Sequence, residues 1–387
     1  MQRAPRRSTR TAWRVRAFDH IAEVDAESWD SILPPGDLQA SHRFIQACQN
    51  SGVENARYRH LMIYRGDRLE AIATLSVFQV SLELLSGAGT RTAIDYVRRM
   101  FPNFLRLRLV VCGLPVSFNR SCLRFRPGAD LEPLLAQVVV AAEDLAVESD
   151  APVVVFKEFD DDEVQSLASL QHFGYFQATS LPSCELPLPW KSFEGYTAAL
   201  RAPYRRLLRR DLAQRSSQGL RVQVLEDPTH HLDRIFPLYE QVMDRAEFQL
   251  ERLPPSFFEE LIQNLRGEHR TILVEHGEDL LAAGILLSSP QETTFLLAGI
   301  DYERNAENRA YFNLVAEVVA EAIRRGAPRL ELGQTSYDLK GRLGARFTSR
   351  HLFLKHRSGL VHPLLRATKH LLFPQLSPVA RRVFKDA

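Results

Sequence analysis

Leu332-Gly-Gln-Thr-Ser-Tyr-Asp-Leu-Lys-Gly-Arg-Leu-Gly344 is the stretch on which the interpretation of this 387-residue chain depends. It continues the short run Arg329–Leu332, which is typical of a strand between turns. A short helix is predicted near Asp338–Leu343, with Asp338 as a candidate N-terminal cap and Gly344 just after its end. A strand, a polar turn, a short helix and a glycine therefore follow one another directly.

The same order of elements occurs a second time in the first half of the chain. The long helical pattern Leu131–Val147 leads to the strongly apolar strand Pro152–Phe156, and a short helix from about Asp162 to His172 ends at a glycine. In the second half, the helix Arg309–Arg325 leads into the opening strand in the same way. We interpret this as a structural repeat with little sequence identity, a chance match of element order being the alternative.

Strands and helices alternate through both halves, which indicates an α/β or layered α+β protein. The other expected strands are His60–Arg65, Leu69–Phe78, Leu105–Cys112, Thr271–Glu275, Leu280–Ser288, Thr293–Ile300 and Arg350–His356, with extended segments reaching about Leu188. We expect two tandem domains, residues 19–188 and 189–358, each with a mixed central sheet flanked by helices. The proline-spaced Leu186–Pro189 suits the join.

The two ends of the chain differ from its body, the first in charge and the second in its amphipathic pattern. Residues 1–16 hold six arginines and no acid, whereas the remainder has 43 basic and 47 acidic residues. We expect residues 1–18 to be a disordered basic arm, with contact to a phosphate or an anionic surface as the alternative. Residues 359–387 form an amphipathic tail, in which Pro363–Phe373 is predicted to pack on the body; resting on an anionic membrane surface is the alternative.

Composition excludes several classes of protein. No apolar run approaches the roughly 20 residues that span a bilayer, and the N-terminus has no apolar stretch typical of a secretory signal. A cytoplasmic protein is expected, which the tail could bring to the inner face of the membrane. Four scattered cysteines fit reduced thiols, and no histidine or cysteine spacing predicts a metal site.

The second half resembles the FemAB-like and BioF2-like branch of the GNAT (GCN5-related N-acetyltransferase) superfamily. The resemblance rests on the arginine-rich Tyr204–Asp211, on Gly299–Glu303 before the Tyr311 helix, and above all on Leu332–Gly344 with its G-x-T, K and L-G pattern. It covers about residues 190–358, whereas residues 20–188 share only the order of elements. It implies transfer of an acyl or aminoacyl group from a thioester or ester donor to an amine of a cell-envelope or polysaccharide-related precursor.

The resemblance also implies where the donor binds. Two parallel strands splay apart in this fold, and the start of the long helix presents free amides to a phosphate. Here that start is Glu303-Arg-Asn-Ala-Glu-Asn-Arg309, without the glycine-rich loop of standard coenzyme A-binding members. The side chains expected to compensate are Arg304, Asn305 and Arg309. Acyl-CoA is the expected donor, with an acyl carrier or an aminoacyl-tRNA as alternatives.

Three side chains are expected to carry the chemistry. By resemblance, Lys340 would stabilise negative charge on the donor carbonyl or on a substrate phosphate. Asp301 could accept the proton of the attacking amine, and Tyr302 could protonate the leaving group. Polar side chains after the strand are expected to contact a ligand: Gln334, Thr335 and Tyr337. The alternative for Lys340 is a solvated lysine on a short helix, and that for Asp301 and Tyr302 is a polar strand end. For Gln334, Thr335 and Tyr337 the alternative is turn formation and capping.

Arginines recur on one face of the helix that begins near Pro203. Arg205, Arg206, Arg209 and Arg210 lie at positions i, i+1, i+4 and i+5. Planar guanidinium groups suit phosphate, so Arg205, Arg206 and Arg209 are expected to contact a small-molecule or phosphate-bearing substrate or the donor. A solvated face is the alternative for the helix. For the whole protein, the alternative function is non-catalytic binding of a polyanion or phospho-ligand in the same cleft.

Overall fold

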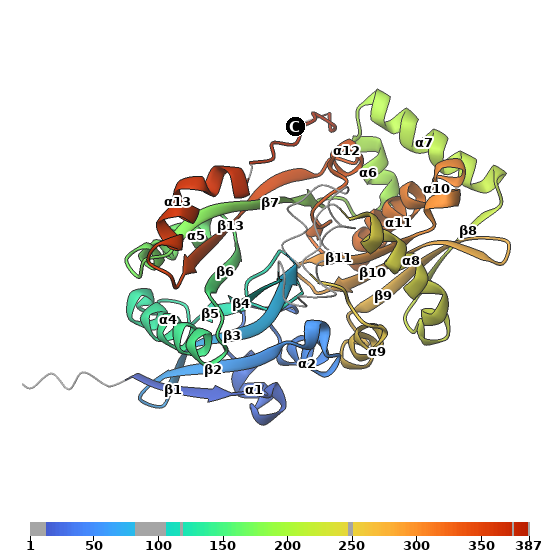
Figure 1. Cartoon of the computed structure of the whole chain (residues 1–387). Helices are drawn as coiled ribbons and strands as arrows, with labels where there is room; N and C mark the ends of the chain where they lie inside the picture. Colours follow the sequence, from blue (N-terminus) through green and yellow to red (C-terminus); the bar gives the residue numbers. More distant parts are fainter. Residues whose placement is uncertain (1–12, 82–105, 117–118, 247–250, 374, 386–387) are drawn as a thin grey trace, which may run out of the picture.

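One mixed sheet runs through the whole molecule (Figure 1). The structure is a computed structural model that describes residues 13–81, 106–116, 119–246, 251–373 and 375–385. Within them the strand order is β1-β2-β3-β4-β6-β13-β7-β12-β11-β10-β9-β8, with β5 beside β3. Helices flank this sheet, so the expected mixed α/β class is confirmed.

The first half contributes one side of the sheet. Its strands are β1 (Trp13–Phe18), β2 (Arg57–Arg65), β3 (Arg68–Ser81), β4 (Arg106–Cys112), β5 (Leu123–Phe125) and β6 (Val153–Phe159). β1 to β4 are antiparallel neighbours, and β6 pairs with β4 in parallel. The helix α4 (Leu131–Glu148) covers these strands with a buried face that includes Leu134, Val138, Ala142 and Leu145, spaced as one side of a helix requires.

The second half repeats the arrangement. Its strands are β8 (Leu220–Leu225), β9 (His269–His276), β10 (Asp279–Ser288), β11 (Thr293–Ile300) and β12 (Arg329–Glu331), the last of which is parallel to β11. The helix α11 (Ala310–Arg325) buries Leu314, Val318 and Ala322 against one face of the sheet. Gly326, with φ 74°, ends α11 in the left-handed conformation that the sequence predicts there.

The last strand of each half closes the sheet of the other half. β7 (Phe176–Pro187) pairs with β12, whereas β13 (Arg346–His356) pairs with β6. β7 and β13 also pair with each other in antiparallel fashion along most of their length (Figure 1). The join expected at Leu186–Pro189 lies at the end of β7. A boundary there divides the sequence into two parts, but each part then contains a strand that completes the half-sheet of the other part.

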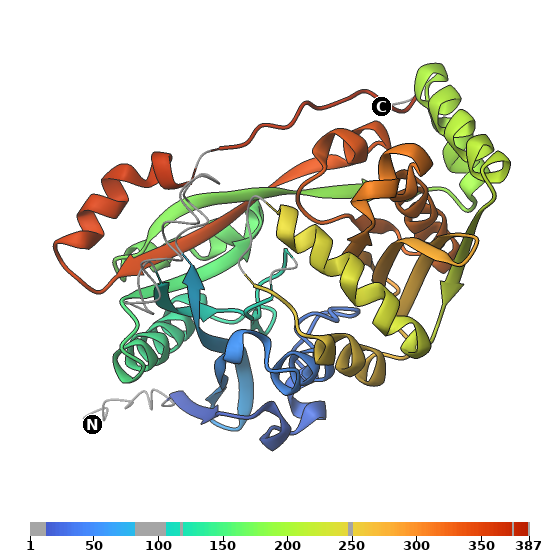
Figure 2. The same ribbon diagram turned by 45° about the vertical axis from the view of Figure 1, so that its right-hand side comes forward.

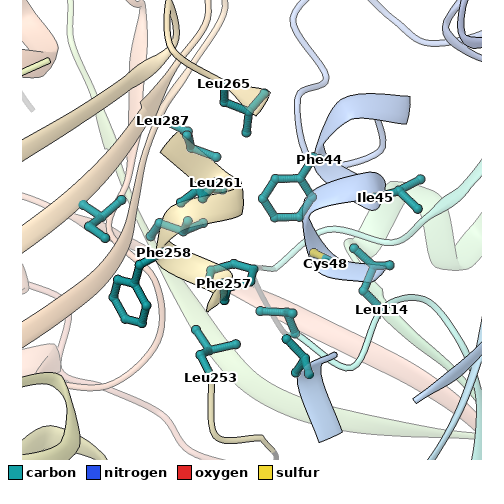
Figure 3. Packing of buried hydrophobic residues seen from close by; sticks show 14 of the residues in the cluster. Phe44, Ile45, Cys48, Leu114, Leu253, Phe257, Phe258, Leu261, Leu265 and Leu287 are labelled. Carbon is teal, nitrogen blue, oxygen red and sulfur yellow. The ribbon is translucent and has the colours of Figure 1, made fainter. Parts of the chain in front are cut away.

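A shared apolar core also joins the halves. Phe44 on α2 (His42–Asn50) lies opposite Phe257 and Leu261 on α9 (Pro255–Asn264), as Figure 3 shows. The cluster continues to α8 (Leu232–Arg245) on the side of the second sheet half away from α11. Large apolar side chains from both halves are therefore buried together, which stabilises their mutual placement.

Most expected elements are present with small shifts, and two differ. The segment Asp162–His172 divides into α5 (Asp161–Ser166) and a 3-10 turn, Ala168–Gln171. The last residues of the expected basic arm form β1 instead, because Trp13–Phe18 pair with β2; residues 1–12 lie outside the described part. The remaining helices are α1 (Ala26–Asp30), α6 (Phe193–Ala199), α7 (Ala202–Ser217), α10 (Tyr302–Asn308), α12 (Tyr337–Arg342) and α13 (Val361–Leu372).

The C-terminal segment returns across the molecule after α13. It runs towards α6 and α7 (Figure 2), where Phe384 bridges to Leu200 and the Arg201 amide donates to the Val383 carbonyl at 2.9 Å. Val383 is buried, whereas α13 has no buried residue. Among the described residues, no helix is both long enough and apolar enough to cross a bilayer.

Exchange of β7 and β13 predicts that neither half folds alone. A fragment of residues 189–387 lacks β7, so β12 loses its antiparallel partner and β13 loses both of its neighbours. We expect this fragment and residues 1–188 to be unfolded or aggregated when expressed separately, and to form a soluble complex when co-expressed. Circular dichroism and size-exclusion chromatography measure this. Cooperative unfolding of the isolated 189–387 fragment would contradict it.

Candidate active site

A cleft opens where β11 and β12 separate. The two strands pair only at Thr293 with Leu330 and at Thr294 with Glu331, after which β11 continues to Ile300 without β12 beside it. A cavity of about 670 Å³ occupies this position. Its lining includes the β11 segment from Thr294 to Ala298, the turn from Leu332 to Tyr337, and Lys340. In the first half, β4 and β6 remain paired from Leu109–Val153 to Cys112–Phe156.

The turn after β12 is held in a constrained conformation. Gly333, Thr335 and Ser336 all have positive φ, at 73°, 69° and 48°. Such values are unfavourable for Thr and Ser and require support from the surroundings. Gln334 provides part of this support, because its Nε2 donates to the Leu181 carbonyl of β7 at 2.7 Å. The exchanged strand therefore positions the wall of the cleft.

Tyr337 is anchored in the same way as Gln334. Its hydroxyl donates to the Pro182 carbonyl of β7 at 2.9 Å, and burial raises its pKa to about 12. Thr335 lies between these two anchored residues and also lines the cavity. The three polar side chains expected after the strand therefore do meet in one cavity, but two of them use their polar atoms to hold the turn.

Lys340 lies at the inner end of the cleft. Its side chain is 2% exposed, and its Nζ donates to the Gln334 carbonyl at 2.9 Å. Burial lowers the pKa of the Lys340 ammonium from 10.5 to about 8, while the neighbouring Cys184 and Glu331 act in the opposite direction. The ammonium is therefore still largely protonated at neutral pH. The structure thus places one buried positive charge against the cavity, as the sequence predicts.

Glu331 is a buried carboxyl group behind the cleft that the sequence-based interpretation missed. It accepts hydrogen bonds from Asn119 Nδ2 at 3.2 Å, from the Gly333 amide at 2.9 Å and from Ser183 Oγ at 3.1 Å. Arg350 Nη2 lies 3.7 Å away. Burial raises the pKa of Glu331 from 4.5 to about 7, with Arg350 opposing the shift. The sequence does contain a signal for this group, because Glu331 is a charged residue inside the predicted strand Arg329–Leu332.

Asp301 and Tyr302 have different surroundings. The Asp301 carboxylate caps α10 and accepts from the amides of Glu303 at 3.0 Å and Arg304 at 3.1 Å. It is not among the described residues that line the cavity, so the structure gives it the capping role. Tyr302 does line the cavity; Arg245 lies 4.2 Å over its ring, and burial raises the pKa of its hydroxyl.

A smaller cavity of about 300 Å³ adjoins the cleft and shares Tyr311 with it. It lies between α7, α11 and α12, and its lining includes Asn305 and Arg309. Arg309 has φ 51° and forms an ion pair with Asp211, a carboxylate whose side chain is 3% exposed. This ion pair lies at the start of the long helix. Standard coenzyme A-binding members have a glycine-rich loop there, and the sequence predicts basic side chains in its place.

The amides at the helix starts are already used. Asp301 accepts from two amides of α10, and Asn305 Oδ1 accepts from the Tyr311 amide of α11 at 2.9 Å. Arg304, expected to bind the donor, pairs instead with Asp279 at 2.5 Å. These contacts satisfy groups that would otherwise bind an anion at a helix N-terminus.

The α7 arginines lie outside both cavities. Arg205 donates to the Leu200 carbonyl at 2.9 Å, and Arg210 contacts Asp211 at 3.1 Å. Arg206 and Arg209 are exposed. The helix therefore presents three exposed guanidinium groups, since Arg210 is exposed as well, whereas its Tyr204 lines the smaller cavity.

Comparisons with known proteins agree with this geometry. Residues 199–341 match the family model described as an acetyltransferase (GNAT) domain. A curated protein of Mycobacterium tuberculosis, described as a putative 8-amino-7-oxononanoate synthase 2, is 25% identical over 327 residues, covering 82% of this chain and 42% of that protein. The chain thus spans about two-fifths of the length of the curated relatives it matches.

Solved structures share the fold over nearly the whole chain. FemX has a TM-score of 0.56 at 13% identity, covering 92% of this chain and 100% of its own. A tandem GNAT protein from the clavulanic acid biosynthesis pathway has a TM-score of 0.52 at 10% identity, covering 90% and 99%. The C-terminal domain of a putative lysylphosphatidylglycerol synthetase from Agrobacterium fabrum has a TM-score of 0.52 at 13% identity, covering 93% and 100%.

The duplicated sheet and the splayed strands define a tandem GNAT fold with an acyltransferase-type domain in its second half. Residues 199–341 match the GNAT domain model, and the chain is similar in fold to FemX and to a tandem GNAT protein and in sequence to the mycobacterial relative. These similarities support the resemblance to the FemAB-like and BioF2-like branch that was drawn from Leu332–Gly344.

The raised pKa of Glu331 predicts a pH-dependent cost to folding. The folded state holds this proton more tightly than the unfolded state, so wild-type stability should fall as the pH rises from 4.5 through 7. Relative to Glu331→Gln, the loss should approach about 3 kcal/mol. Urea unfolding between pH 4.5 and 8 measures the difference.

Glu259→Gln is a matched control on the surface of α9, because Glu259 is exposed. Its stability curve should run parallel to that of the wild type over the same pH range. A Glu331→Gln curve that also runs parallel to the wild type would mean that Glu331 is ionised throughout.

Proposed function

We propose that this protein is an N-acyltransferase that moves an acyl or aminoacyl group from a thioester or ester donor to an amine in the β11–β12 cleft. The observation that carries the proposal is a cavity of about 670 Å³ between separated parallel strands with the buried Lys340 ammonium against it. Beyond Thr294, β11 has no β12 residue paired to it. This edge offers backbone groups to the donor carbonyl.

The chemistry requires stabilisation of an oxyanion. The acceptor amine attacks the donor carbonyl carbon, and negative charge develops on the carbonyl oxygen until the C–S or C–O bond breaks. The Lys340 ammonium would stabilise that charge more strongly in a buried site than in water. Tyr302, whose raised pKa keeps it protonated, would donate a proton to the leaving group. Because Asp301 is a helix cap, the proton of the amine would leave through solvent.

The helix starts restrict how the donor binds. A pyrophosphate at the beginning of α11 would meet the buried Asp211 carboxylate and the Tyr311 amide that Asn305 already occupies. This favours a donor whose phosphates lie elsewhere, for example near the exposed Arg206 and Arg209 of α7. Three kinds of donor meet this condition: an acyl-CoA whose phosphates do not lie at the start of α11, an acyl carrier, and an aminoacyl-tRNA. The acceptor class, an amine of a cell-envelope or polysaccharide-related precursor, rests on the FemAB-like resemblance.

Transfer assays with separate donors test the proposal. Purified protein is incubated with a radiolabelled acyl-CoA or aminoacyl-tRNA and with amine acceptors such as amino-sugar nucleotides, and native mass spectrometry identifies ligands that remain bound. Amide formation that depends on the protein supports the proposal. Absence of transfer from every donor, together with salt-dependent retention of polyanions, would instead support the non-catalytic binding function.

Lys340→Met should reduce turnover by about 10²- to 10³-fold, the usual effect of removing one group that stabilises an oxyanion. Wild-type turnover should also fall as the pH rises through about 8, because the ammonium loses its proton there. The variant should lack this alkaline limb. Steady-state rates between pH 6 and 9.5 measure both effects.

Lys191→Met is the control for this variant, since Lys191 is exposed and lies outside both cavities. It should retain wild-type turnover and the alkaline limb. Equal turnover by Lys340→Met and the wild type, with both proteins folded, would remove Lys340 from the mechanism.

A further inference from the structure

Exposed apolar side chains gather in one segment of the chain. Of the nine large apolar residues exposed among the described residues, six lie between positions 360 and 379: Leu360, Val361, Leu364, Leu371, Leu376 and Val379. Single exposed apolar residues are ordinary, but a cluster of them marks an interaction site. This segment comprises α13 and the chain that follows it.

α13 has two faces that differ in their surroundings. Its inner face is attached to the sheet, because the His362 ring packs 5.5 Å from Phe176 and Lys369 Nζ donates to the Gln177 carbonyl at 3.2 Å. Its outer face carries Leu360, Leu364 and Leu371, which are 88%, 62% and 81% exposed. Intervals of four and seven residues place these leucines in one stripe. The helix is thus fixed to the body while its apolar stripe is exposed to solvent.

The same part of the chain has an unusual charge. Residues 339–385 contain eleven lysines and arginines and no acid, whereas the rest of the chain has 38 basic and 47 acidic residues. Several of these cations pair with acids elsewhere, such as Arg381 with Asp338 at 2.7 Å. On α13 itself, Arg366 and His370 are exposed. The leucine stripe therefore lies beside these two basic side chains, with no acid on the helix, which complements an anionic surface.

We propose that α13 docks on an anionic lipid surface, with Leu364 and Leu371 entering the boundary of the acyl chains and Arg366 contacting lipid phosphates. An apolar face flanked by cations is the arrangement of helices that lie in the plane of a membrane. A two-fold contact with a second copy would instead bring Arg366 and His370 close to their own counterparts. The opposite charge of anionic lipid removes that repulsion.

Docking in this way has a consequence for the cleft. Leu376 lies four residues after the end of α13, is 45% exposed, and also lines the large cavity. The segment that follows α13 therefore borders the cavity. This inference concerns binding alone and stands independently of the acyl-transfer reaction, although it would bring the cleft to substrates that reside at a membrane.

Vesicle co-sedimentation of the full chain tests the proposal. Vesicles of phosphatidylcholine with 30 mol% phosphatidylglycerol are compared with pure phosphatidylcholine vesicles at low salt and at 0.5 M NaCl. We expect binding to the anionic vesicles that weakens with salt. The double variant Leu364→Glu/Leu371→Glu should weaken binding by at least about tenfold, since it replaces both inserted side chains by anions.

Val140→Glu/Val147→Glu is the matched control, because these side chains belong to α4 and not to α13, and are 57% and 62% exposed. It should bind anionic vesicles like the wild type. Equal effects of the two double variants, or absence of binding to anionic vesicles, would overturn the proposal. Sedimentation equilibrium completes the test: wild-type self-association that Leu364→Glu/Leu371→Glu abolishes would identify a second copy as the occupant and overturn it as well.

Leu371→Trp provides a direct readout of insertion. Its fluorescence should shift to shorter wavelength on addition of anionic vesicles and should be quenched by brominated acyl chains. Val147→Trp should show neither change. Identical responses of the two tryptophan variants would contradict insertion of α13, even if the protein sediments with the vesicles.

Discussion

The pairing of β7 with β13 is the interaction on which the rest of the structure depends. Each strand belongs by sequence to one half and completes the sheet of the other, so β6 and β12 each acquire their second neighbour only when both halves are present. Backbone hydrogen bonds therefore link the two repeats into one sheet. The apolar contact between α2 and α9 adds a second connection. Duplication here produces a single folding unit in which neither copy is structurally complete.

The cleft depends on the same exchange. Gln334 and Tyr337 hold the turn after β12 by hydrogen bonds to β7 carbonyls, and Ser183 of β7 donates to Glu331. The turn contains Thr335 and Ser336 at positive φ, which cost free energy unless the surroundings support them. A strand of the first half thus fixes a wall of the cavity in the second. The paired β4 and β6 leave the first half without the corresponding separation of strands.

Buried charge distinguishes this cleft from an ordinary apolar groove. Lys340 and Glu331 both have pKa values moved towards neutrality by burial, and a network of amide and hydroxyl donors satisfies the carboxyl group. The starts of the helices are not prepared for an anion in this way. Asp301, Asn305 and Asp211 already contact groups there that could otherwise bind a phosphate. The site is therefore equipped to stabilise charge near a carbonyl and is poorly suited to a pyrophosphate at α11.

The sequence by itself predicted most of the local elements, the repeat of their order and the segment that borders the candidate site. Apolar periodicity identified the strand Thr293–Ile300 and the helix ending at Gly326, because a buried face imposes a spacing that does not depend on distant residues. The pattern from Leu332 to Gly344 located Lys340, Gln334 and Tyr337. Only the tertiary structure decided that Asp301 caps a helix, that Arg309 pairs with Asp211, that Glu331 is a buried neighbour of Arg350, and that β7 and β13 change places. Those outcomes depend on which long-range partner satisfies a charge or a strand edge, and many partners are equally compatible with the local sequence until the chain is folded.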